Sequence, residues 1–167
     1  MKPAIRNLRL GLGVALAVVV LDQASKIWML ALIFNPPRVL EVTPFFNLAP
    51  AWNRGVSFGL LAHESPWAPW LLSALAVAIV IFLLRWLIRA ENAVVAAALG
   101  LVLGGAVGNA IDRLRFGAVV DFLDFHAFGW HFWAFNLADA GITVGAAVLL
   151  LLSLLPERLS QVPDRPK

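Results

Sequence analysis

Residues 108–139 read GNAIDRLRFGAVVDFLDFHAFGWHFWAFNLAD, and they connect the end of one long apolar run to the start of the next. Four aspartates lie in this stretch: Asp112, Asp121, Asp124 and Asp139. Carboxylates beside a lipid boundary are costly because hydrocarbon does not solvate charge, so they usually mark a functional site. We therefore start from this stretch and ask which of its acids could act together.

The composition of the chain is that of an integral membrane protein. Of its 167 residues, 61% are hydrophobic and only 14% are charged, whereas soluble domains are about 45–50% apolar and roughly a quarter charged. The length suits a single membrane domain covering residues 1–167. The absence of cysteine excludes disulfides, thiolate nucleophiles and cysteine-ligated metals. Basic residues are spread over chain ends and loops rather than clustered, which argues against a nucleic-acid partner.

Four apolar stretches are long enough to cross a bilayer. We predict spans at about residues 10–34, 66–84, 93–111 and 137–155, because about 20 predominantly apolar residues suffice. The third stretch is rich in alanine and glycine, which lets neighbouring helices approach closely. The predicted fold is therefore an all-α membrane protein, built as a bundle of four transmembrane helices.

The predicted loops at about residues 35–65 and 112–136 lie on the same side of the membrane. Residues 38–59 are rich in β-branched and aromatic residues, with breakers such as Pro44 and Pro50, and predict two or three short strands in a small β-rich loop. Of the 13 basic residues, eight lie in the termini and the short middle loop, and five on the opposite side. The excess of positive charge predicts cytoplasmic termini and places both longer loops outside the cytoplasm.

Asp121 and Asp139 are the acids that we expect to act together. Asp121 lies in the apolar segment 118–123 with no local partner, a setting that raises the pKa of a carboxyl group. The flanking spans are antiparallel, and their connection is long enough to bring Asp121 against Asp139. Two carboxylates in one site hold a proton between them, which suits activation of a water for amide hydrolysis. The structural alternative for Asp139 is a capping box at a helix start, with Asn136 as the N-cap.

The other charged residues have simpler interpretations. Asp112 follows the third span, where Arg113 offsets an acid at a helix C-terminus. Asp22 and Lys26 are four residues apart on one helical face, and two alternatives stay open for them. They either neutralise each other, with Lys26 reaching the membrane surface, or they shape the site. Asp124 is expected to be a solvated or arginine-paired loop acid.

No metal site is predicted, because His126 and His131 fit no ligand pattern and are expected to be polar residues of the membrane interface. The aromatic residues around them predict an interfacial belt. That belt would consist of Phe122, Phe125, Phe128, Trp130, Phe132, Trp133 and Phe135.

Five short motifs give the chain a resemblance to the bacterial lipoprotein signal peptidases, the signal peptidase II family. They read D-Q-x-S-K at 22–26, N-x-G-x-x-F at 53–58, G-N-x-x-D-R at 108–113, V-V-D-F at 119–122 and F-N-x-A-D at 135–139. Each motif alone is weak, but five in this order and at this spacing relative to four spans are highly specific. The resemblance covers almost the whole chain.

This resemblance implies an aspartic endopeptidase of the bacterial inner membrane, with Asp121 and Asp139 as catalytic residues and no cofactor. Its substrate would be a diacylglyceryl-modified prolipoprotein, cleaved before the lipidated cysteine. The family's substrate-contacting positions fall on Asn53, Asn109, Arg113 and Asn136, and the positions expected to support the site are Asp22, Lys26 and Asp112. The implied fold adds an extracytoplasmic β-cradle and a short surface helix to the four-helix bundle. The cyclic peptide antibiotic globomycin would be an inhibitor.

Two functions from other classes are alternatives. A small transporter or channel subunit could use Asp22, Asp112 and Asp139 as a proton or cation relay, which requires acids spread along the membrane depth. A membrane scaffold would need no pairing of Asp121 with Asp139. The sequence favours the protease because its acids gather at one membrane face with asparagine and arginine beside them.

Overall fold

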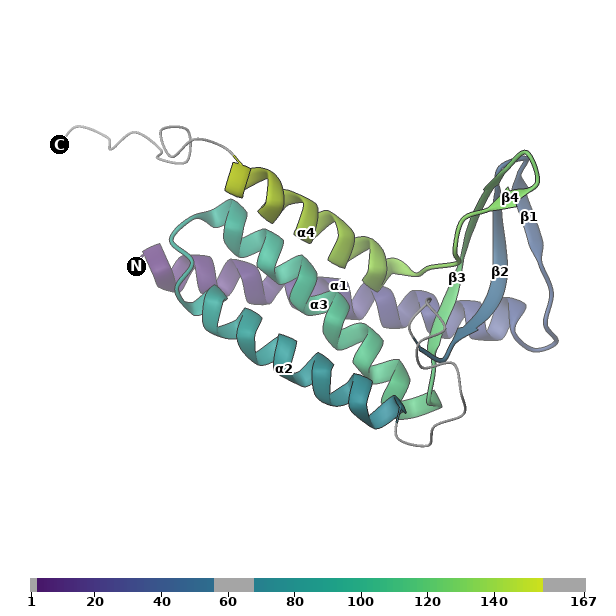
Figure 1. Cartoon of the computed structure of the whole chain (residues 1–167), viewed down its shortest axis with the longest axis horizontal. Coiled ribbons are helices and arrows are strands. Elements are labelled where there is room, and N and C mark those ends of the chain that lie inside the picture. Colours follow the sequence, from purple (N-terminus) through teal and green to yellow (C-terminus); the bar gives the residue numbers. More distant parts are fainter. Residues whose placement is uncertain (1–2, 56–67, 155–167) are drawn as a thin grey trace.

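Four helices run side by side, and a small sheet lies at one end of them (Figure 1). The computed structural model describes residues 3–55 and 68–154. In chain order the elements are α1 (Pro3–Ile33), β1 (Leu40–Thr43), β2 (Phe46–Asn53), α2 (Ala68–Ile88), α3 (Ala93–Phe116), β3 (Val119–Ala127), β4 (Trp130–His131) and α4 (Leu137–Leu154). The start of α1 and the end of α4 lie at the end of the bundle away from the sheet (Figure 1).

Helix α3 is the central element, packed against α1, α2 and α4. It begins where the Asn92 side chain accepts a hydrogen bond of 2.7 Å from the amide of Val94, and it ends at Gly117, whose φ of 69° is left-handed. A Cβ on Gly104 would lie 2.6 Å from the carbonyl oxygen of Ala15 on α1. The predicted close approach of helices along the glycine-rich span is thus confirmed, because no larger residue fits between these two backbones.

The helices have the length and outer surface of membrane spans. Three of them are long and apolar enough to cross a bilayer, at Ala4–Ile33, Ala93–Phe116 and Leu137–Leu154, and α2 contributes a shorter apolar helix, Ala74–Ile88. Large apolar side chains point outward, among them Leu16, Leu21, Trp28, Leu150 and Leu151. An exposed apolar surface of this extent is stable in lipid rather than in water. The chain is therefore a largely helical membrane protein.

Two helices extend beyond the apolar stretches that predicted them. Helix α1 begins at Pro3 rather than near residue 10, and α3 continues to Phe116 rather than ending near residue 111. Charged residues extend both helices, since backbone hydrogen bonding does not stop where apolar sequence does. The described residues do not include 56–67 and 155. Part of the predicted loop 35–65 and one end of each of the predicted spans 66–84 and 137–155 therefore lie outside them.

The sheet is assembled from both loops. Its four strands are antiparallel in the order β1-β2-β3-β4. Strands β1 and β2 confirm the strands predicted in the first loop, although β2 runs through Pro50 with a register shift between Leu48 and Ala51. Strand β3 was not predicted as a strand, and it pairs with β2 along most of its length. Within residues 3–55 and 68–154 the only helices are α1 to α4, so the short surface helix stays a prediction.

Candidate active site

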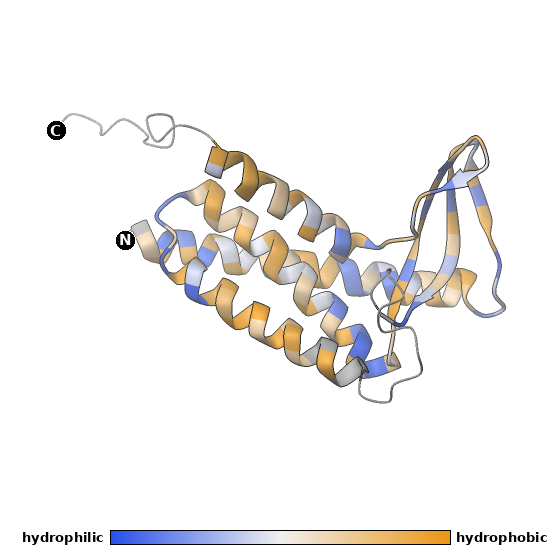
Figure 2. Cartoon of the chain, viewed as in Figure 1, coloured by the Kyte–Doolittle hydropathy of each residue, from blue (hydrophilic) through white to orange (hydrophobic). Residues whose placement is uncertain are grey.

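Hydrophilic residues gather where the helices meet the sheet (Figure 2). Five elements contribute to this junction: the second half of α1, the ends of β2 and α3, the start of β3 and the first turn of α4. The junction brings together all the residues that the sequence assigned to the site, with the contacts described below.

Asp121 is a buried carboxylate at the start of β3. Val119 and Val120 before it favour the strand, and the Asp121 residue is only 2% exposed. Its two oxygens accept hydrogen bonds from the side-chain amides of Asn53, at 3.1 Å, and Asn136, at 2.6 Å. Burial, and secondly the charge of Asp139, raise the pKa of Asp121 to about 6, against the opposing effects of these amides and of Lys26.

Asp139 lies in the first turn of α4 and is held from two sides. Its backbone amide donates to the Asn136 side chain at 3.0 Å, and its own carboxylate accepts from the Asn136 backbone amide at 3.3 Å. This reciprocal pair confirms the predicted capping box. The other carboxylate oxygen accepts from the side-chain amide of Asn109 at 2.7 Å.

Two asparagine side chains link the carboxylates to each other. The Asn109 oxygen accepts from the Lys26 ammonium at 3.1 Å, and because an ammonium only donates, the Asn109 NH2 group faces Asp139. The Asn136 NH2 group donates both to Asp121 and, at 3.2 Å, to the Asn109 oxygen. Asp121 and Asp139 are therefore joined through a fixed chain of amides rather than exposed separately.

A buried ionic cluster lies beneath these amides. The Lys26 ammonium is 2.9 Å from Asp22 and 2.7 Å from Asp112, and all three residues are 2% exposed or less. Asp22 also accepts from the backbone amide of Ala138 at 3.0 Å, and Asp112 from that of Val120 at 3.1 Å. The cluster thus fixes the start of α4 and the start of β3 against α1 and α3.

These contacts bear on what the sequence left open. Lys26 does not reach the membrane surface but is buried between two carboxylates, so that part of the first alternative was wrong. The role of Asp22 and Lys26 in shaping the site stays a prediction. Asp112 lies inside α3 rather than after it. Its close ion pair is with Lys26, at 2.7 Å, while the predicted partner Arg113 contributes only the attraction of its charge.

Gln23 is a member of the site that sequence reasoning missed. Its side-chain amide donates to Asp112 at 2.9 Å and to the carbonyl oxygen of Gly108 at 3.2 Å. Gly108 is equally constrained, because a Cβ there would lie 2.6 Å from a carboxylate oxygen of Asp22. Both residues belong to the family motifs quoted above, and this membership was the sequence feature that could have identified them as site residues.

Arg113 lies beside the site without a close carboxylate contact. One of its terminal nitrogens is 3.4 Å from the Asn109 carbonyl oxygen, and its Nε is buried without a hydrogen-bond partner. The charge of Arg113 nevertheless interacts with those of Asp139, Asp121 and Asp112. A buried donor without an acceptor is uncommon in proteins.

Two predictions about the second loop were wrong. Asp124 is only 7% exposed and is held by Asn47 and His131, so it is neither solvated nor paired with an arginine. Phe122 is buried between sheet and helix, at 3% exposure, and does not belong to an interfacial belt. Phe122 packs against Met29 and Ile33 of α1. The other aromatics of the loop are exposed or half-buried.

A cavity of about 530 Å³ opens beside Asp139. Its polar lining comes from Asn53, Asp139 and Thr143, and its apolar lining from Phe132, Trp133, Ala134, Phe135, Ala140 and Val144. Such a cavity suits an apolar ligand that presents one polar group to the carboxylates. Over residues 3–55 and 68–154, no group of three or more histidine and acidic residues is arranged to hold a metal ion.

Comparisons with known proteins agree with this geometry. The family model described as "Signal peptidase (SPase) II" matches residues 14–155. The lipoprotein signal peptidase of Methylobacterium sp. (strain 4-46) is 44% identical over 162 residues, covering 96% of this chain and 98% of the relative. That of Methylorubrum extorquens (strain PA1) is 47% identical over 152 residues, covering 89% and 87%.

Solved structures give the same picture. One described as a bacterial membrane enzyme matches with a TM-score of 0.74 at 29% sequence identity, covering 94% of both chains. A second with the same description has a TM-score of 0.73 at 31% identity, covering 86% of this chain and 92% of the other.

Proposed function

This chain belongs to the signal peptidase II family of membrane proteases that remove signal peptides from prolipoproteins, and we propose that Asp121 and Asp139 are its catalytic pair. The observation that carries this proposal is the shared chain of amides between the two carboxylates, together with the pKa of Asp121, raised to about 6 by burial and by Asp139. Near neutral pH such a pair holds one proton for part of the time, which an acid/base mechanism requires.

In the proposed reaction the two carboxylates activate one water molecule. The ionised carboxylate removes a proton from the water as its oxygen attacks the scissile carbonyl carbon. The protonated carboxyl group donates a hydrogen bond to the developing oxyanion, and a proton then passes to the leaving amine as the C–N bond breaks. The pair titrates as a unit, so the acid and base roles belong to the pair rather than to one residue.

Neighbouring residues have proposed roles in substrate binding. Asn53 and Asn136 donate to Asp121 and flank the place where the peptide must lie, and Asn109 orients Asp139. Arg113 has a buried, unpaired Nε that can donate to a peptide carbonyl group. The supporting residues are Asp22, Lys26 and Asp112, which hold the elements together without touching the substrate.

The proposed substrate is a diacylglyceryl-modified prolipoprotein, cleaved before its lipidated cysteine. The apolar cavity beside Asp139 supports this, because it can accept an apolar group next to the scissile bond. No cofactor takes part. A globomycin-type cyclic peptide would inhibit by occupying the same cavity.

The proposed location is the bacterial inner membrane, with α2 as the fourth span and residues 1–167 as one domain. Both chain ends would be cytoplasmic, because eight of the 13 basic residues lie in the termini and the middle loop. The sheet lies at the end of the bundle away from the start of α1 and the end of α4 (Figure 1). With cytoplasmic chain ends, the sheet and the site beside it would lie at the extracytoplasmic face.

Cleavage of a diacylated prolipoprotein by the purified protein in lipid nanodiscs tests the proposal. We expect Asp121→Asn and Asp139→Asn each to abolish cleavage while keeping helix content and apparent Tm, since asparagine preserves size. Glu41→Gln changes an exposed acid on β1 and is the control that keeps full activity. Robust turnover by Asp121→Asn would refute the catalytic pair.

A further inference from the structure

The β3–β4 hairpin carries a side-chain contact that the proposed reaction does not use. Residues His126 and His131 face each other in this hairpin, and the turn at Phe128 and Gly129 has positive φ at both positions. Beyond β4 the chain stays attached to β3, since the Phe132 amide donates to the Phe125 carbonyl at 2.7 Å. The segment from β4 to α4 is therefore laid along the sheet.

The contact joins three strands at one carboxylate. Asp124 on β3 accepts from the Asn47 amide of β2 at 3.2 Å, and both of its oxygens lie 3.0 Å from the Nδ1 of His131 on β4. A carboxylate is an acceptor, so Nδ1 carries the proton and donates. Asp124 is 7% exposed, and a carboxylate buried to this extent needs its donors.

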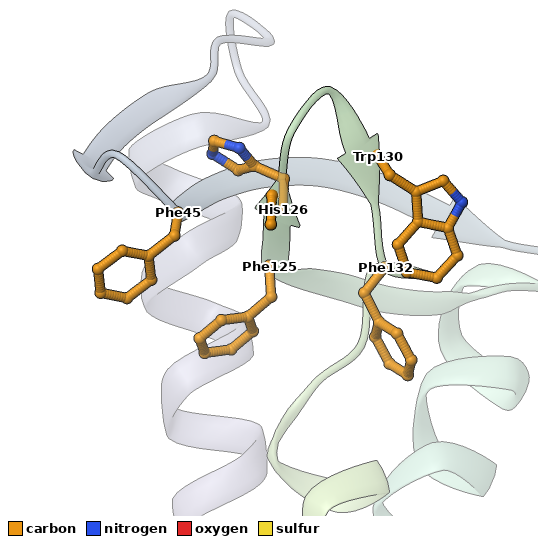
Figure 3. A pocket seen from close by; sticks show the side chains of 6 residues that line it. Phe45, Phe125, His126, Trp130 and Phe132 are labelled. Carbon is orange, nitrogen blue, oxygen red and sulfur yellow. The ribbon is translucent and has the colours of Figure 1, made fainter.

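Phe132, the residue after His131, forms a wall shared by two cavities. One is the cavity of about 530 Å³ beside Asp139, whose lining continues with Trp133. The other is a smaller cavity of about 310 Å³. In Figure 3 the side chains of Phe45, Phe125 and Phe132 project to the same side of the sheet. The position of His131 thus sets the position of the aromatic wall that follows it.

We propose that Asp124 and His131 are positioning residues for substrate binding, which hold Phe132 and Trp133 as the apolar wall of the cavity beside Asp139. The proposal rests on the proposed function. Phe132 and Trp133 are 51% and 68% exposed, so they present apolar surface that only a ligand or lipid can cover. The contact between Asp124 and His131 fixes the end of β4, and this keeps the apolar wall that follows it in one position.

Steady-state kinetics on the diacylated prolipoprotein in nanodiscs separates positioning from chemistry. His131→Leu removes the donor, and we expect KM to rise about tenfold, the equivalent of about 1.4 kcal/mol, with kcat within about twofold of wild type. Asparagine places its NH2 close to the position of Nδ1, so His131→Asn should restore KM to within about threefold. His126→Leu is the matched control, because His126 stacks on His131 but its Nε2 has no hydrogen-bond partner. Its KM should not change.

Asp124→Ala removes the same contact from the other side and should give the same rise in KM, which keeps the test valid if His131→Leu does not fold. An unchanged KM in both variants overturns the proposal. So does a fall in kcat alone, or a His131→Asn variant as impaired as His131→Leu. Absence of cleavage by the wild-type protein would instead refute the proposed function itself.

Discussion

Replacement of Asn53 by alanine is expected to move the alkaline limb of the pH–rate profile to higher pH. The Asn53 amide donates to the Asp121 carboxylate at 3.1 Å and lowers its pKa. Without this donor the ionised form is less stable, so the pKa of the pair must rise. The proposed reaction needs one ionised and one protonated carboxyl group. Because the charge of ionised Asp139 helps to raise the pKa of Asp121, this pKa marks the loss of the last proton of the pair, and a higher pKa keeps the pair active to higher pH.

The size of the shift follows from the hydrogen bond. A hydrogen bond to a charged group contributes about 1.5–3 kcal/mol, and Asn53 is half-buried, so water replaces part of it. A remaining loss of about 1.4 kcal/mol corresponds to about one pKa unit. The alkaline limb should move from about 6 to roughly 7, which raises the protonated fraction of Asp121 at pH 7 from about one tenth to about one half.

The assay is kcat/KM for a diacylated prolipoprotein between about pH 5 and 9, because this parameter reports the pKa values of the free enzyme. The ratio of kcat/KM in Asn53→Ala to that in the wild-type protein should be about fivefold higher at pH 7 than at pH 5. Asn7→Ala is the control, since Asn7 is also a buried asparagine but donates to Ala90 and Glu91. An alkaline limb that stays in place, moves to lower pH, or shifts equally in Asn7→Ala would refute the reasoning.

Two further substitutions test how the carboxylates are held. Gly108→Ala places a Cβ on α3 2.6 Å from the Asp22 carboxylate. It should lower turnover about 100-fold by displacing this carboxylate, which holds the Ala138 amide at the start of α4. Gly13→Ala, with open space around it, should leave turnover unchanged. Asn136→Ala removes the cap of α4 and the amide on Asp121. It should cost about 1 kcal/mol of stability and lower turnover about 100-fold. Asn92→Ala removes the cap of α3 and should cost similar stability while keeping turnover. Thermal unfolding and cleavage assays measure both effects, and equal turnover in either matched pair would contradict the prediction.

The helices could be predicted because their signal is local. An apolar run of about 20 residues crosses a bilayer whatever the rest of the chain does, and α1, α3 and α4 lie where such runs predicted them. The capping box of Asn136 and Asp139 could also be predicted, because both partners lie within one helical turn. The family resemblance also came from the sequence alone, since its motifs are short and ordered.

The partners of the buried charges were decided only by the tertiary structure. Lys26 is 83 residues from Asn109, and its contact with Asp112 depends on how closely α1 and α3 approach. The same holds for Asp124, which the sequence placed in solvent and which the pairing of β2 with β3 and β4 buries instead. The sequence of residues 108–139 shows four aspartates but does not tell which donors each of them has. What separates them is which donors the folded chain brings within 3 Å or so of each carboxylate, and a buried charge is stable only where such donors exist.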